Sequence, residues 1–154
     1  MRTFYYLSTI ILFAFSFSAC KKDVNAQLSN LIVGKWAVAK FTVSQYKNGV
    51  ITTDSYSYVT PDSVLTNGTG SFYDFHKDGT GWEQTYDPNY IAPIAFNYHI
   101  SGTNVTFSHA SNIIHQTSCT IISLTSNILI LQDISVYENA GDSYKTIEVV
   151  DFKK

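Results

Sequence analysis

Turn signals are the feature of this sequence that most constrains its fold. From Leu31 onward, runs rich in Val, Ile, Thr, Tyr and Phe are separated by residues that favour tight turns. Asn48-Gly49 is the strongest of these signals, because both residues tolerate the positive φ angles of a type I′ hairpin turn. The pattern predicts about nine antiparallel strands joined mostly by hairpins. Further tight turns are predicted at 78–79, 101–104, 126–127 and 139–142, and longer links at 60–70 and 87–93.

A chain of consecutive hairpins favours a barrel. A long antiparallel meander curls and closes, since closure removes the unpaired edge strands. A two-sheet sandwich is the alternative, but its crossovers need longer connections than most of those present here. We therefore predict an all-β fold, an antiparallel up-and-down meander barrel of about 8–9 strands whose last strand pairs with its first. Only one short stretch, around 26–32, favours a helical turn.

Alternation within the predicted strands indicates an interior lined by large side chains. In the segment 94–100, Phe96 and Tyr98 share one face, and Asn97 and His99 share the other. The inward rings form either a cavity wall for an apolar or planar ligand, or the filled core of a small barrel. The residues predicted to line the interior are Tyr73, Phe75, Trp82, Phe96, Tyr98, Phe107, Leu129 and Leu131. Four tyrosines near loops are interpreted as a contact surface at the open end: Tyr56, Tyr58, Tyr86 and Tyr90.

The N-terminal segment has the layout of a secretory signal. Arg2 is followed by an apolar stretch that ends near Phe17, then by Ser18-Ala19 and Cys20. The apolar stretch is shorter than the ~20 residues of a membrane-spanning helix. With Cys20 in this place, the segment resembles a bacterial lipoprotein signal. The resemblance implies cleavage before Cys20, a diacylglycerol on its sulfur, and an acyl chain such as palmitate on the new amine.

These features divide the chain into three parts. Residues 1–19 are predicted to be the signal peptide, 20–30 a lipid-anchored polar tether, and 31–154 a single domain. We expect the anchor to hold that domain at the outer membrane of the bacterial cell envelope. A formal net charge of −2 and a charged fraction of 14% provide no basic surface for nucleic acid, which is not expected as a partner.

No residue pattern predicts catalysis, a metal or another cofactor. No two of the four histidines (76, 99, 109 and 115) have the close spacing of a zinc ligand set. Asp74 and His76 share a strand face without a serine nucleophile motif, although convergence with a hydroxyl in a cleft would favour hydrolysis. Cys119 is predicted to be a small core or wall residue, because His115 lies about 13 Å away along the strand. With Cys20 lipidated, no internal disulfide is expected.

Four sequence pieces resemble a known family. They are Gly34-Lys35-Trp36, YDFHKDGTG at 73–81, FNYHISGTNVTF at 96–107 and IISLTSNILIL at 121–131. In this order they resemble the lipocalin-like domains of lipoproteins of the Bacteroidetes type. The resemblance implies a lipocalin-like barrel in which Gly34 allows a close approach at the barrel end and Trp36 plugs the narrow base. Lipocalins proper pack a late arginine on this tryptophan; here Lys145 is the expected substitute, through a cation–π contact.

Two functions remain open from the sequence. The first is a non-catalytic, lipid-anchored carrier whose barrel binds a small apolar or aromatic ligand, held mainly by the burial of apolar area. The second is an interaction module with a filled barrel, which binds a protein or glycan partner through its loops and outer wall. In addition, Asp62-Ser63-Val64 resembles the Asp-Ser/Thr-aliphatic sequence that Bacteroidetes modify with O-glycans.

Overall fold

The computed structural model describes residues 24–61, 70–85, 92–109, 113 and 117–154. Its order is one described helix followed by ten strands. Their bounds are α2 (Val24–Ile32), β1 (Gly34–Lys47), β2 (Val50–Ile51), β3 (Tyr56–Val59), β4 (Phe72–Phe75), β5 (Thr80–Gln84), β6 (Ile94–Ser101), β7 (Asn104–Phe107), β8 (Ser118–Leu124), β9 (Ile128–Asn139) and β10 (Asp142–Lys153). Cys20, Asp62-Ser63-Val64, Tyr86, Tyr90 and His115 lie outside the described residues.

The strands form one closed antiparallel sheet. Strands β4 to β10 pair in chain order, β4 pairs with β1, and β1 also pairs with β10, so the ring closes. The β1–β10 ladder runs from Ala37 opposite Lys153 to Lys47 opposite Tyr144. The two short strands β2 and β3 lie outside the ring and pair only with β1. The predicted meander barrel with its first strand paired to its last is therefore confirmed.

A bulge in β1 determines which side chains face inward. The register with β10 shifts between Val38 and Lys40. Below the shift, Trp36 and Val38 are buried in the core, whereas above it Phe41 and Val43 face the interior. A bulge inserts one extra residue into a strand and so reverses the alternation beyond it. The upper half of β1 consequently presents odd-numbered residues to the inside.

Helix α2 covers one end of the barrel. Leu28 packs against the core, and Ile32, one helical turn later, is fully buried in it. The indole Nε1 of Trp36 donates a hydrogen bond to the carbonyl oxygen of Ile32 at 2.6 Å. The predicted helical turn is present, and it is longer than expected. Residues 24–30, interpreted above as part of a tether, are instead helical and belong to the folded domain.

Lys154 completes the barrel base beside Gly34 and Trp36. Its Nζ lies 4.6 Å from the centroid of the Trp36 ring and donates a 2.6 Å hydrogen bond to the carbonyl oxygen of Val33. Gly34 has a φ angle of 121°, and a Cβ there would lie 2.7 Å from Cε of Lys154. The expectation that Lys145 fills this role is wrong. Lys145 is exposed in β10 opposite Tyr46 of β1 and far along the strand from the base.

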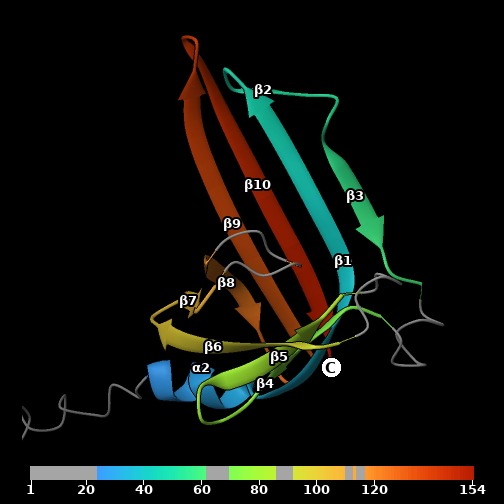
Figure 1. Ribbon diagram of the computed structural model, residues 1–154, viewed down its shortest axis with the longest axis vertical. Helices are drawn as coiled ribbons and strands as arrows, with labels where there is room; N and C mark the ends of the chain where they lie inside the picture. Colours follow the sequence, from blue (N-terminus) through green and yellow to red (C-terminus); the bar gives the residue numbers. More distant parts are fainter. Residues whose placement is uncertain (1–23, 62–69, 86–91, 110–112, 114–116) are drawn as a thin grey trace, which may run out of the picture.

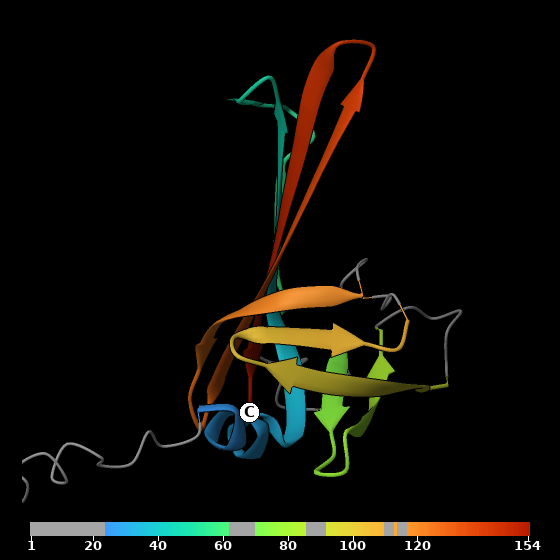
Figure 2. The same cartoon turned by 90° about the vertical axis from the view of Figure 1, so that its left-hand side faces the viewer.

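Part of the sheet rises well above the barrel. The upper halves of β1, β9 and β10, together with β2 and β3, form what we call the extension (residues 40–59 and 133–149; Figures 1 and 2). Its tip is joined by polar contacts: Asp142 accepts a 2.7 Å hydrogen bond from Asn48 and lies 2.6 Å from Nζ of Lys47. Most of the exposed large hydrophobic side chains in the described part of the chain belong to this extension. The extension and α2 lie at opposite ends of the molecule (Figure 1).

Candidate functional site

Most residues predicted to line the barrel interior do lie there. Six of them are buried in one hydrophobic core: Tyr73, Phe75, Phe96, Phe107, Leu129 and Leu131. Tyr98 is partly buried against the same core, and its hydroxyl donates a 2.6 Å hydrogen bond to the carbonyl oxygen of His76. Trp82 is the exception. It is 44% exposed and alternates with the buried Glu83, so its side chain belongs to the outer wall.

The aromatic residues of the lower barrel pack against one another. The Tyr73 ring lies 5.4–5.7 Å, centroid to centroid, from the rings of Phe75, Phe96, Phe107 and Phe152. These spacings are those of stacked and edge-to-face aromatic pairs, which add stability beyond the burial of area. Gly81 makes room for this packing, since a Cβ there would lie 2.5 Å from the Phe96 ring. In this part of the interior the rings act as core.

Above the aromatic core, an apolar surface continues the interior onto the extension. We call it the open-end patch; it consists of Phe41, Val43, Tyr56 and Tyr58. In the register between β1 and β3, Phe41 is opposite Tyr58 and Val43 is opposite Tyr56. Val43 is buried, whereas Tyr56 and Tyr58 are 53% and 54% exposed. Large apolar side chains at the mouth of a barrel form the type of surface on which small ligands are held.

Two carboxylates lie beside this patch on the neighbouring strands β10 and β9. Asp133 of β9 is directly opposite Glu148 of β10, and Glu148 is opposite Val43 of β1. Burial raises the pKa of Asp133, and the charge of Glu148 adds to the effect, while a backbone hydrogen bond from Ile134 opposes it. The open end of the barrel is therefore apolar on strands β1 and β3 and acidic on the adjacent strands β10 and β9.

Cys119 is a free cysteine whose side chain is buried, with an exposed fraction of 3%. It lies close enough to the two carboxylates for their charges to act on it. Burial raises the pKa of its thiol to about 12, and the charges of Asp133 and Glu148 contribute. A thiol with such a pKa stays protonated and is a poor nucleophile at neutral pH. Its environment is that of the small core or wall residue that the sequence predicts.

Asp74, His76 and a hydroxyl do come close to one another in the β4–β5 hairpin. His76 Nδ1 is 3.0 Å from the hydroxyl oxygen of Thr80, and His76 Nε2 is 3.9 Å from the Asp74 carboxylate. The Thr80 hydroxyl, however, donates its hydrogen to Asp78 Oδ1 at 2.7 Å. The backbone N–H of Thr80 donates to the same oxygen at 3.0 Å, and these bonds lower the pKa of Asp78. The cluster thus closes the hairpin turn and supplies no activated nucleophile.

Sequence reasoning placed Tyr56 and Tyr58 at the open end, but it missed Phe41, Val43 and one buried charge. Strict alternation from the inward Trp36 would place Phe41 and Val43 on the outer face of β1. The bulge between Val38 and Lys40 brings them to the inner face instead. Glu83 is 1% exposed and lies opposite Tyr73 in the β4–β5 register. Its position two residues after the inward Gly81 is the signal that would have placed it inside. Among the described residues, no group of His, Cys, Asp and Glu has the arrangement of a metal site.

The geometry defines the class to which this protein belongs. Of the ten strands in its sheet, β2 and β3 lie outside the ring, and the others close into a barrel with a helix and a tryptophan at its base. A family model described as a lipocalin-like domain matches residues 32–131. The chain belongs to this lipocalin-like domain family, as the motifs predict. No curated protein matches the chain.

The matched range ends within β9, before the last strand of the barrel and the extension. Residues 132–154, which supply the upper half of β9 and all of β10, follow the matched range. No helix in the described ranges is both long enough and apolar enough to cross a membrane.

Proposed function

We propose that this protein binds a small apolar or aromatic molecule at the open end of its barrel, without catalysing a reaction. The open-end patch is the observation that carries the proposal. Its two tyrosines are half exposed, yet they lie on the face that continues the barrel interior. Membership of the lipocalin-like family supports the same function, because such barrels generally bind small ligands.

The packing of the interior determines where the ligand lies. The rings around Tyr73 fill the lower barrel, so the ligand rests on them and against the open-end patch. Burial of apolar surface supplies most of its affinity, at about 25 cal/mol per Å². Glu148 lies next to Val43 of the patch, and Asp133 lies next to Glu148, so both carboxylates border the ligand along the same wall. They favour a ligand that carries a hydrogen-bond donor at one end.

A fluorescent apolar probe tests the site directly. We expect the neutral dye N-phenyl-1-naphthylamine to bind with enhanced emission. We expect Tyr58→Ala to weaken its binding about tenfold, through loss of roughly 60 Å² of apolar contact. Val59→Ala is the matched control, because Val59 is the next residue of β3, is 64% exposed, and faces the other side of the sheet. Equal affinities for the two variants, or no binding to the unmodified protein, would refute the site.

We further propose that the protein is anchored in the bacterial envelope through a lipid on Cys20. The support is the sequence alone: the signal-like residues 1–19 end in Ser18-Ala19 immediately before this cysteine. In cells fed a palmitate analogue that can be labelled, the unmodified protein should take up label and sediment with membranes. Cys20→Ser should do neither, and Cys119→Ser should behave like the unmodified protein. Labelling that persists in Cys20→Ser would place the lipid elsewhere.

A further inference from the structure

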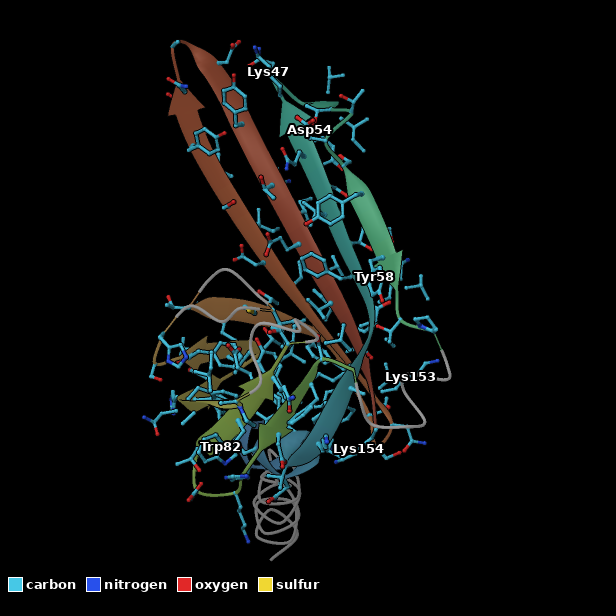
Figure 3. All side chains as sticks on the ribbon, turned by 45° about the vertical axis from the view of Figure 1, so that its right-hand side comes forward. Lys47, Asp54, Tyr58, Trp82, Lys153 and Lys154 are labelled. Atoms are coloured by element: carbon cyan, nitrogen blue, oxygen red, sulfur yellow. The ribbon has the colours of Figure 1, made fainter. Side chains whose placement is uncertain are left out.

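A shallow pocket opens on the outer wall of the barrel, apart from the open end. It has a volume of about 290 Å³, close to the lower limit of about 300 Å³ for small-molecule sites. Trp82 lies on the barrel body and Tyr58 on the extension, so the pocket and the open-end patch are separate surfaces (Figure 3). The residues that line the pocket are Thr80, Gly81 and Trp82 of β5, and Ala95, Phe96 and Asn97 of β6.

Trp82 gives this pocket an open aromatic face. Its cross-strand neighbours are Asp74 on β4 and Ala95 on β6, and neither covers an indole ring. The ring pairs found in the described part of the chain do not include Trp82, which remains 44% exposed. An indole of this exposure at the centre of a sheet has unused apolar area. A flat ligand therefore has exposed indole surface on which to stack.

Two polar side chains, those of Thr80 and Asn97, line the same pocket as this ring. Thr80 and the exposed Asn97 are directly opposite each other in the β5–β6 register and form one end of the pocket. The Thr80 hydroxyl is held by Asp78 at 2.7 Å and by His76 at 3.0 Å, so its orientation is set before a ligand arrives. Asp74 is the neighbour of Trp82 on β4, away from the pocket, and its carboxylate lies 3.9 Å from His76 Nε2. The pocket thus offers hydrogen-bonding oxygen and nitrogen atoms at one end of an apolar platform.

The charges near this pocket balance. Asp74 is opposite Lys35 in the β1–β4 register, and Asp78 follows Lys77 in the β4–β5 turn. Neither a strong anion nor a strong cation is therefore favoured by the local field. The ligand that fits has no net charge, one apolar face and several hydroxyl groups at its edge.

We propose that the Trp82 pocket binds one pyranose ring of a neutral saccharide. A pyranose has a face of C–H groups that stacks on an indole, and its equatorial hydroxyls point outward in the plane of the ring. Stacking on Trp82 brings those hydroxyls within reach of Thr80 and Asn97 at one end of the pocket. The site lies on the outer wall and is independent of the ligand at the barrel mouth.

Titration of the isotopically labelled protein with saccharides, followed by amide NMR, tests this proposal. The probes are cellotetraose, maltotetraose and the tetramer of β-1,4-linked N-acetylglucosamine. We expect at least one of them to shift the Trp82 indole signal and the backbone amides of Gly81, Ala95 and Asn97 in a saturable way. Trp82→Ala should weaken that binding about tenfold or more, the effect of losing one aromatic stacking contact.

Two further variants keep the test independent of folding. Ala95→Leu retains the indole but fills the pocket, and should also weaken binding, while dispersed amide signals show that the barrel is intact. Ile122→Ala, which removes an equally exposed side chain from β8, should bind like the unmodified protein. Absence of binding by all three saccharides, or shifts confined to Phe41 and Tyr58, would overturn the proposal. Equal shifts with tetramethylammonium chloride alone would identify a cation site instead.

Discussion

Lys154 shows how much one residue can contribute at the base of a small barrel. Its ammonium lies over Trp36, donates to the carbonyl of Val33, and occupies space that only a glycine at position 34 leaves open. The three contacts connect the segment entering β1 to the residue that follows β10. They replace the arginine–tryptophan contact of lipocalins proper with a lysine that follows the last strand, nine residues beyond the expected Lys145.

We expect Lys154→Ala to lower the free energy of unfolding by about 0.5–2 kcal/mol, the range for a cation–π contact. The variant Lys153→Ala is the control, since Lys153 is the exposed last residue of β10 and directly precedes Lys154. Urea unfolding followed by the fluorescence of buried Trp36 measures both. Equal midpoints for the two variants would show that the contact adds nothing to stability.

Asp133 should make the stability of the barrel depend on pH. A carboxyl whose pKa is higher in the folded than in the unfolded protein destabilises the fold once it is ionised. The cost is absent below the unfolded-state pKa of about 3.9 and increases as the pH rises through the folded-state pKa. Asp133→Asn should therefore stabilise the protein at neutral pH, and the gain should disappear in acid.

Thermal unfolding of this variant across the pH range gives the measurement. Asp54→Asn is the control, because it removes the same charge from an exposed loop residue of the extension. A gain for Asp133→Asn that does not change with pH, or an equal gain for Asp54→Asn, would contradict the assignment of the effect to burial.

Among the elements, the β9–β10 hairpin has the least favourable turn. Its central residues Ala140 and Gly141 have φ angles of 50° and 87°, which define the same turn class as Asn48-Gly49 at 51° and 80°. Alanine in the left-handed region costs about 1–2 kcal/mol, whereas asparagine tolerates that region through its short polar side chain. The hairpin is therefore formed in spite of its first turn residue.

Ala140→Asn should raise the free energy of unfolding by about 0.5–1 kcal/mol, because it creates the preferred Asn-Gly turn. Ala140→Val should lower it, since a β-branched residue is the least tolerant of a positive φ angle. Chemical unfolding of both variants provides the comparison. The reverse order of stabilities would mean that the tip contacts of Asp142, and not the turn, determine the hairpin geometry.

The elements also show what could be predicted from the sequence. Hairpin turns are local, so their residues predict them directly, and the meander and its closure follow from their number and spacing. The bulge at Ala39 is not local, because it reflects pairing with β10, and without it Phe41 and Val43 are assigned to the wrong face. The same limit applies to Trp82, whose aromatic character predicts an interior position although its strand places it outside. The interior and the two tyrosines of the open end could be predicted from the sequence, but their pairing with Phe41 and Val43, and the wall pocket, required the structure.

For the molecule as a whole, the barrel and the extension should differ in stability. The barrel residues lie around a continuous core, whereas the extension exposes large side chains such as Val50, Tyr56 and Val136 to solvent. Local opening follows the density of buried contacts, so the extension should open at lower free energy than the barrel.

Native-state hydrogen exchange measures this difference residue by residue. Amides of β9 and β10 between Ile134 and Lys145 should exchange well before those of the same strands near Leu129 and Phe152, with a difference of about 2 kcal/mol or more. The extension part of the β9–β10 pair is thus the test, and the barrel part of the same two strands is its control. Equal protection along the two strands would show that the extension and the barrel form a single cooperative unit.

The pairing of β1 with β10 has a consequence for how the protein comes to be folded. Val33 and Lys154, which meet at the base, are 121 residues apart in the sequence. A nascent chain leaving the ribosome therefore presents its first strand with one edge bare until nearly all of the domain has been synthesised. Contacts between such distant segments form slowly. Closure of the ring is therefore expected to be the slow step of folding, and until it occurs the free edge of β1 is open to pairing with another chain.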